Sequence, residues 1–311
     1  MGNIKNLNKV KNFNLKVYNL FMKKGISYFG TRDLRWVKKD LDEIKKGNFS
    51  YIIHTFSEED LRYYKENMKE IVYESKKRDF EVFFDPWGIG KFFGGEPPSF
   101  FNSEYPFECI NIESKRINVA CPNSKKFKGI LREWTEFAIE IGVDGIFIDE
   151  PKIFEGKCFC KNCNGKDLKE SVIKFLIWVS KLWKGKNKKV SICLLPKSLK
   201  DEFLNTFFKN KNFDIIGTDP YPILFKDFEK ESKECVYFLK KYKEKYKKEI
   251  EIWIQNFKLK KSEEKYIKKF YNFCKDEKID RVSFWGFMGC YEMGYLRCER
   301  PFKVWEIVKS L

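Results

Sequence analysis

Short runs of β-branched and aromatic residues alternate along the chain with longer segments whose apolar residues recur every three or four positions. The short runs are typical of buried strands, and the longer segments have the period of amphipathic helices. Eight strands are predicted, near residues 26–30, 51–55, 81–85, 145–149, 190–195, 213–218, 250–256 and 281–286. Eight strand–helix repeats in this order predict an α/β fold, the (β/α)8 barrel.

The helical segments carry recognisable apolar stripes and start signals. The first stripe runs from Leu34 to Ile44, Ser57 is expected to cap the next helix, and the last helix is predicted to begin at Pro301. A doubly wound open sheet would show the same alternation. That fold usually carries a Gly-rich phosphate-binding turn after an early strand, and this sequence has none. The closed barrel is therefore the preferred prediction.

Two stretches are longer than a minimal barrel needs, namely 86–123 after the third strand and 151–166 after the fourth. Both follow the carboxyl ends of strands, which is where barrel enzymes keep their active sites. The first stretch contains a Gly-rich run, 88–95, which lacks phosphate-loop spacing and is interpreted as a mobile loop on the active face. The predicted organisation is an N-terminal extension, 1–25, and a single barrel domain, 26–311.

The chain has a formal net charge of +17, with 62 Lys and Arg against 45 Asp and Glu. Lysines predominate and are spread over nearly every predicted helix, which is typical of a solvated, ion-paired surface such as thermophilic proteins have. Nucleic acid is thus a disfavoured partner, and an acidic polymer stays as an alternative substrate. The first 25 residues lack the apolar stretch of a signal or membrane helix, so we expect a cytoplasmic protein without membrane attachment.

Carboxylates are concentrated where the predicted strands end. Asp85 ends the third strand, Asp149 and Glu150 end the fourth, and Asp219 follows the sixth. General acid and base catalysis on an acetal needs two such groups facing one cleft. Neighbouring residues on a regular strand point in opposite directions, so Asp149 and Glu150 can share the cleft only if the backbone turns there. Structural roles as capping or ion-paired acids are the alternative.

Other candidate ligand contacts lie at or near the strand ends. Aromatic rings can stack on the apolar faces of sugars, although most rings in a chain with 18% aromatic residues belong to the core. His54 is either a substrate ligand or a hydrogen-bonded structural residue. Because it is the only histidine in the chain, a histidine-based metal cluster is excluded. The predicted substrate-binding set is His54, Trp87, Tyr28, Arg32, Tyr221, Gln255 and Trp285, with Trp253 as a further aromatic candidate.

The segment Asp149-Glu150-Pro151 resembles the Asn-Glu-Pro that closes the fourth strand in retaining barrel glycosidases, where the Glu is the general acid/base. It is also similar to the Asp-Glu-Pro or Asp-His-Pro of glycosidase-like barrel proteins from archaea and bacteria. In those proteins a Cys-Pro-Asn turn precedes the segment and closely spaced cysteines follow it, as Cys121-Pro122-Asn123 and residues 158–163 do here. The resemblance implies a glycoside hydrolase-like barrel with Glu150 as proton donor.

One departure concerns the seventh strand, where retaining glycosidases place a nucleophilic Glu. Here the strand reads Ile-Trp-Ile-Gln-Asn, with Gln255 near that position. The second carboxylate must then be Asp219, Asp85 or Asp149. Because strands four and six are not adjacent, their end groups are expected roughly 7–10 Å apart, which suits an inverting mechanism with water between the acids.

Cys158, Cys160 and Cys163 have a spacing suited to soft-metal ligation. Cys121 is the predicted fourth ligand of a structural zinc if the two insertions meet, with Cys109 as the other candidate. A disulfide within this set, or free thiols, are the alternatives, and Cys290 and Cys298 could also bridge one another.

The sequence therefore predicts a glycoside hydrolase that acts on a carbohydrate by carboxylate acid/base catalysis and needs no catalytic cofactor. Its alternatives are a carbohydrate-binding barrel without activity, which the missing seventh-strand Glu favours, and a basic nucleic-acid-binding protein. The sugar and the oligomeric state are left open.

Overall fold

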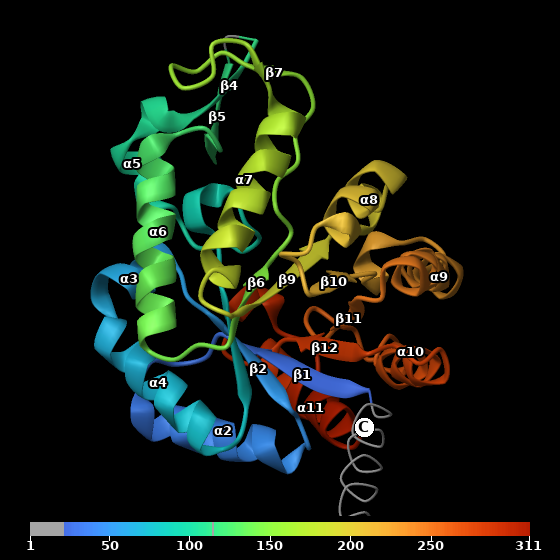
Figure 1. Ribbon diagram of the computed structural model, residues 1–311. Coiled ribbons are helices and arrows are strands. Elements are labelled where there is room, and N and C mark those ends of the chain that lie inside the picture. Colours follow the sequence, from blue (N-terminus) through green and yellow to red (C-terminus); the bar gives the residue numbers. More distant parts are fainter. Residues whose placement is uncertain (1–21, 114) are drawn as a thin grey trace, which may run out of the picture.

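Eight parallel strands close into a barrel in the computed structural model, which describes residues 22–113 and 115–311 (Figure 1). Around the barrel the order is β1-β12-β11-β10-β9-β6-β3-β2. The strands are β1 (Lys23–Tyr28), β2 (Tyr51–Thr55), β3 (Glu81–Asp85), β6 (Gly145–Ile148), β9 (Lys189–Leu194), β10 (Ile215–Thr218), β11 (Glu249–Gln255) and β12 (Arg281–Trp285). The predicted (β/α)8 barrel is confirmed, and its strand ends differ from the predicted ones by at most three residues.

The largest difference is at β1, which begins at Lys23, inside the predicted extension; residues 1–21 of that extension lie outside the described part of the chain. Lys23 pairs with Arg281 of β12, so the strand starts with charged residues. The buried Lys24 is accommodated because its ammonium lies 4.5 Å above the ring of Phe49. Two lysines at a strand start give no apolar signal, which is why the sequence pattern placed this strand too late.

Helices surround the strands in Figure 1. They are α2 (Leu34–Lys46), α3 (Glu58–Tyr63), α4 (Lys65–Lys77), α6 (Lys125–Glu140), α7 (Leu168–Lys184), α8 (Asp201–Lys209), α9 (Phe228–Tyr246), α10 (Lys265–Asp276) and α11 (Pro301–Lys309). Ser57 caps α3 through the backbone N–H of Asp60, and α11 begins at Pro301, as predicted. The helix expected after β2 is divided in two at Tyr64.

Successive residues along each strand face alternately the interior of the barrel and the surrounding helices. Tyr51, Ile53, Phe83 and Phe147 pack with one another inside the barrel, whereas their neighbours along the strands pack against the helices. This alternation decides which residues at the strand ends can reach the mouth of the barrel.

The two predicted insertions follow β3 and β6. The first holds the short helix α5 (Phe100–Glu104) and the hairpin of β4 (Cys109–Ile112) and β5 (Lys115–Ala120). The second holds the two-residue strands β7 (Lys157–Cys158) and β8 (Lys166–Asp167). Figure 1 shows the hairpin and β7 together at the top of the view, and the backbone N–H of Phe159 donates to Asn111 O at 2.7 Å. The two insertions therefore meet.

The Gly-rich run 88–95, which the sequence predicted to be a mobile loop on the active face, is packed against the core. Ile89, Phe92 and Phe93 within it are buried in the main core, and the side chain of Glu58 accepts a hydrogen bond from the Gly90 N–H at 2.7 Å. Three large apolar side chains anchor the run, and the glycines let its backbone approach its neighbours. Within the described residues, none of the helices combines the length and the apolarity that crossing a membrane requires.

Candidate active site

Three carboxylates point into the mouth of the barrel from the ends of three strands. Asp85 ends β3, Asp149 follows β6, and Asp219 follows β10. Each lies an even number of residues beyond an inward-facing residue of its own strand, so the two-residue period of the strand turns it inward. The sequence prediction that these acids converge at the carboxyl ends of the strands agrees with this geometry.

Glu150 reaches the same region because the backbone turns at this residue. β6 ends at Ile148, and Glu150 has a φ of 32°, in the left-handed region that side chains other than glycine seldom adopt. Because of this turn, the side chains of Asp149 and Glu150 can both face the mouth of the barrel. Glu150 is partly exposed, and its charge adds to the burial that raises the pKa of Asp219, so the two carboxyl groups lie close enough to influence one another. The separation of roughly 7–10 Å that the strand order predicted for these two acids stays a prediction.

The other three acids are buried with few partners. Asp85, Asp149 and Asp219 are at most 9% exposed. Among the described residues, neither carboxylate oxygen of Asp85 or of Asp219 meets a hydrogen-bond donor such as an N–H group. Such burial is costly, because desolvated carboxylates are normally stabilised by donors or by opposite charges.

A buried acid at the opposite end of the barrel has hydrogen-bond donors around it. Glu251, on β11, accepts hydrogen bonds from Tyr51 and Ser283 at 2.8 Å and from Ser191 at 3.0 Å. The guanidinium of Arg281 lies 3.9 Å above the Tyr51 ring in the same layer. Glu251 is thus a fully satisfied structural acid, and the contrast marks the acids at the mouth as candidates for chemistry.

The pKa values of the three buried acids are all raised. Burial is the largest cause in each case, because it disfavours the charged form. The charge of Asp149 raises the pKa of Asp85 further, and that of Glu150 raises the pKa values of Asp149 and Asp219 further. Asp85, Asp149 and Asp219 therefore hold protons at a pH where isolated carboxyls would be ionised.

The Gly-rich run covers Asp149. The Gly94 N–H donates to Asp149 O at 2.9 Å, and a Cβ atom at Gly94 would lie 2.1 Å from Asp149 Oδ2. A Cβ at Gly95 would lie 2.0 Å from the Trp87 ring, and Gly95 has a φ of 108°. Glycine at these two positions lets the backbone rest directly on an acid and on an aromatic ring. The sequence pattern showed the glycines but not what they approach.

Trp87 and Trp285 belong to an aromatic group around the acids, as predicted. Trp87 is stacked on Phe29 with a centroid distance of 6.0 Å, and Trp285 lies 5.4 Å from the same ring. Trp285 also contacts Trp253 at 5.7 Å, and Tyr221 is buried two residues beyond Asp219. Phe29 packs against both Trp87 and Trp285, but it was absent from the predicted set. It is the first residue after β1, and the alternation along that strand turns it inward.

Tyr28 and His54 face the helix layer instead of the mouth. The Tyr28 hydroxyl donates to Asp40 Oδ2 on α2 at 2.8 Å, and His54 Nε2 is hydrogen-bonded to Ser75 Oγ on α4 at 2.9 Å. Both residues are completely buried, and burial lowers the pKa of His54 to about 3. The geometry corresponds to the structural alternative for His54, and both residues occupy outward positions of paired strands.

Gln255 lies at the end of β11, but its amide is engaged by the chain itself. Its Oε1 accepts from the Ile223 N–H at 3.1 Å, and its Nε2 donates to Phe257 O at 2.8 Å. The residue thus fixes the loop after β10. Arg32, in the loop after β1, forms an ion pair with Asp60 at 2.7 Å and borders a cavity of about 770 Å³ that Trp87 also lines.

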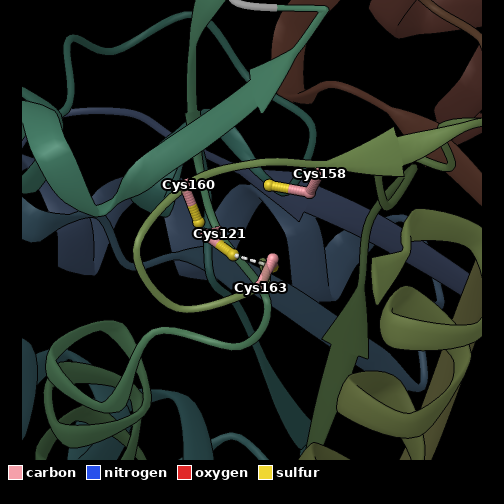
Figure 2. A group of neighbouring side chains, drawn as sticks. All are labelled: Cys121, Cys158, Cys160 and Cys163. Atoms are coloured by element: carbon pink, nitrogen blue, oxygen red, sulfur yellow. Dashed lines mark hydrogen bonds between the residues drawn. The ribbon is translucent and has the colours of Figure 1, made fainter. Parts of the chain in front are cut away.

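Four cysteines gather where the two insertions meet (Figure 2). The sulfurs of Cys121, Cys158, Cys160 and Cys163 lie within 4.8 Å of one another, and all four residues are buried. Tetrahedral zinc with sulfur ligands needs sulfurs roughly 3.8 Å apart, so the group has the size of a four-thiolate metal site. Cys121 takes the fourth position, as predicted, whereas Cys109 lies outside this group.

Backbone and amide N–H groups complete the cysteine group. The Asn111 N–H donates to Cys158 Sγ at 3.4 Å, and the Asn123 side chain donates to Cys163 Sγ at 3.1 Å. Such bonds stabilise thiolates around a metal. The sulfurs of Cys121 and Cys163 are 3.2 Å apart, and all the cysteines are free thiols in this structure. The disulfide alternatives, including Cys290 with Cys298, are therefore not formed here.

No family model matches the chain, and no curated protein sequence matches it. Solved structures do match. A β-galactosidase from Rahnella sp. R3 superposes with a TM-score of 0.67 at 13% identity, over 94% of this chain and 56% of that one. An endo-1,4-β-mannanase from Rhizomucor miehei gives 0.62 at 10% identity, over 94% and 96% of the chains. One of two fungal β-1,4-galactanases gives 0.59 at 9% identity, over 93% and 99%. At such identities the likeness shows the fold alone: the chain is a (β/α)8 barrel, like these three proteins.

Proposed function

We propose that the chain hydrolyses glycosidic bonds in a carbohydrate, with Glu150 as the proton donor. The observation that carries the proposal is the set of three buried acids near Glu150 at the mouth of the barrel, of which Asp85 and Asp219 have no hydrogen-bond donor among the described residues. Barrel proteins keep their chemistry at this end, and acetal hydrolysis needs little besides two carboxyl groups. The mannanase, β-galactosidase and galactanase folds and the Asp-Glu-Pro resemblance to the archaeal and bacterial glycosidase-like branch agree with this assignment.

Glu150 is the donor because it is the most accessible of the four acids. Burial raises the pKa of Asp219, and the charge of Glu150 raises it further. Asp219 therefore keeps its proton at a higher pH than an isolated carboxyl group does. In this proposal Asp219 acts as a positioning residue for Glu150, which delivers a proton to the leaving oxygen.

Asp85 is the better candidate for the base that activates water. The sequence left Asp219 and Asp85 as alternatives. Burial apart, Glu150 is the largest cause of the raised pKa of Asp219, which places Asp219 nearer to the proposed acid than an inverting base should be. Asp85 is influenced by the charge of Glu150 without being hydrogen-bonded to it. This arrangement fits an inverting hydrolysis, in which water lies between the acid and the base.

The stereochemical outcome tests these roles. Neutral oligosaccharides are incubated with the protein, and proton NMR follows the anomeric configuration of the first product. Inversion is expected, and Asp85→Asn should abolish turnover, whereas Asp79→Asn, with a 90% exposed side chain, should not. A retained configuration contradicts the role of Asp85. Binding without any hydrolysis would select the alternative of a carbohydrate-binding barrel.

We also propose that the cysteine group binds one structural zinc ion. Four buried sulfurs from two insertions form a closed set of ligands, which is the structural rather than the catalytic type of site. The purified protein should contain one zinc per chain by elemental analysis. Cys121→Ser should lose the metal and lower the thermal midpoint, whereas Cys235→Ser, outside the group, should keep both. A zinc-free protein with an unchanged thermal midpoint after Cys121→Ser contradicts the site.

A further inference from the structure

The cavity of about 770 Å³ is built by the segments after β1, β2 and β3. Its volume is within the roughly 300–1,000 Å³ that ligand pockets occupy. Arg32, Asp60 and Trp87 line it, together with Tyr64 and Asn67 from the start of α4. In the described chain none of the four mouth acids lines it, but Trp87 follows Asp85 by two residues. The cavity is thus on the same face of the barrel as the acids.

Arg32 is held in the cavity wall by the chain itself. Its Nε and Nη2 atoms bind the two oxygens of Asp60 at 2.7 and 3.0 Å, and Nη2 also donates to Thr55 O at 2.9 Å. Its Nη1 atom is buried, so it does not face the cavity. Arg32 therefore contributes to the wall as a fixed, ion-paired side chain.

The charge of the lining argues against an anionic ligand. Arg32 is paired with Asp60, Asp33 is paired with the exposed Arg35, and Glu59 adds a further carboxylate to the wall. The wall therefore has no excess of positive charge in spite of the net charge of +17. A neutral hydroxyl group can donate to these carboxylates without charge repulsion.

Trp87 supplies a fixed aromatic platform. Its ring lies 15° from parallel to the Phe29 ring behind it, and Gly95 packs against its edge. Tyr64, which is 37% exposed, adds a second ring to the same cavity. A pre-positioned aromatic ring beside hydroxyl-binding polar groups suits the apolar face and the polar edge of a pyranose.

We propose that this cavity binds neutral sugar units of a polysaccharide that extends from the acid site, so that the protein acts within chains of uncharged sugars. The proposal rests on the proposed function for the location of the scissile bond. It disfavours the acidic polymer that the net charge suggested, because the carboxylates that line the cavity outnumber its one lining cation, Arg32, which is already paired with Asp60.

Binding is measured by calorimetry with the Glu150→Gln protein, which prevents turnover, using mannohexaose, cellohexaose and hexagalacturonate. At least one neutral hexamer should bind about ten-fold or more tightly than hexagalacturonate. Tyr64→Ala and Trp87→Ala should each weaken that binding by about ten-fold, which corresponds to the loss of one aromatic contact. Tyr73→Ala and Trp36→Ala are matched controls, because these exposed rings lie outside the cavity, and they should bind normally.

Tyr64→Ala keeps the test valid even if Trp87→Ala does not fold, because Tyr64 is a surface side chain. Preferred binding of hexagalacturonate, or unchanged binding of the neutral hexamers by Tyr64→Ala, overturns the proposal. The corresponding turnover measurements use the protein with Glu150 intact. If a neutral hexamer is hydrolysed and Tyr64→Ala leaves its KM unchanged, sugar binding in the cavity is refuted and the proposed hydrolysis is not. If a neutral hexamer binds, Tyr64→Ala weakens that binding, and no hydrolysis occurs, sugar binding in the cavity is supported and the proposed function is refuted.

Discussion

Buried acids at the two ends of this barrel differ in what surrounds them. Glu251 receives three hydrogen bonds from hydroxyl groups, whereas Asp85 and Asp219 lack donors among the residues described. Unsatisfied groups of this kind lower the free energy of unfolding, and proteins tolerate them mainly where function requires them. The raised pKa values at the mouth are the electrostatic consequence of that cost.

Asp219→Asn should therefore stabilise the protein increasingly as the pH rises. The folded-state pKa of Asp219 lies above its unfolded value because of burial and Glu150. Its protonation stabilises the fold fully below the unfolded pKa, and this contribution is lost as the pH rises through the folded pKa. Asparagine does not titrate, so the variant should gain on the unsubstituted protein by about 1.4 kcal/mol for each unit of the shift.

Urea unfolding between pH 4 and 9 measures this difference, with Asp79→Asn as the exposed control. The same substitution should reduce hydrolysis, because Glu150 loses the carboxyl group that positions it. Parallel stability curves for Asp219→Asn and the unsubstituted protein would show that Asp219 is ordinarily ionised, contrary to its raised pKa.

The sequence allowed the identities of these acids to be predicted, but only part of their arrangement. Asp85, Asp149 and Asp219 follow from the strand period, because each continues an inward-facing register. The same period would have excluded Tyr28 and His54 from the mouth, since they occupy outward positions. The turn at Glu150 could not be read from residue types, because a positive φ at a non-glycine residue is imposed by the surrounding packing.

At the scale of elements, the two insertions make different contacts near the active face. The first covers Asp149 with the backbone of the Gly-rich run, and both together assemble the cysteine group. Cysteine spacing within 158–163 was informative in the sequence, because those ligands are close along the chain. The meeting of Cys121 with this cluster depends on the β4–β5 hairpin packing on β7, a contact that sequence spacing suggested but could not establish.

Gly94→Ala should reduce activity without a comparable loss of stability. A Cβ atom there would lie 2.1 Å from Asp149 Oδ2, so either the carboxylate or the covering segment must move. A displacement of about 1 Å in such a site lowers rates by about 100-fold. The kcat of the variant is compared with that of Gly129→Ala, on α6, where the added Cβ meets no atom within 4 Å in the described chain.

Gly129→Ala should instead raise the free energy of unfolding by about 0.5–1 kcal/mol, because alanine favours the helix interior. If Gly94→Ala retains full kcat, the close approach of the run to Asp149 has no part in the chemistry.

At the scale of the whole molecule, charge and fold give different information about function. The net charge of +17 suggests an anionic partner, yet the cavity beside the mouth is lined by an excess of acids. Many lysines instead pair with carboxylates of neighbouring elements, as Lys184 does with Asp214 at 2.9 Å and Lys243 with Asp280 at 2.7 Å. Such pairs belong to the surface of the barrel and contribute little individually. The barrel itself was predictable because its eight repeats are regular, whereas the chemistry had to be sought in its strand ends.

The most direct test of glycosidic hydrolysis by this site is the rate of reducing-end release from neutral polysaccharides by the unsubstituted protein and by Glu150→Gln. Removal of a general acid typically lowers the rate by 10²–10⁴-fold, and a fall of at least about 100-fold is predicted. Glu155→Gln, five residues away with an 82% exposed side chain, should retain the full rate. Equal rates for Glu150→Gln and the unsubstituted protein would contradict the account.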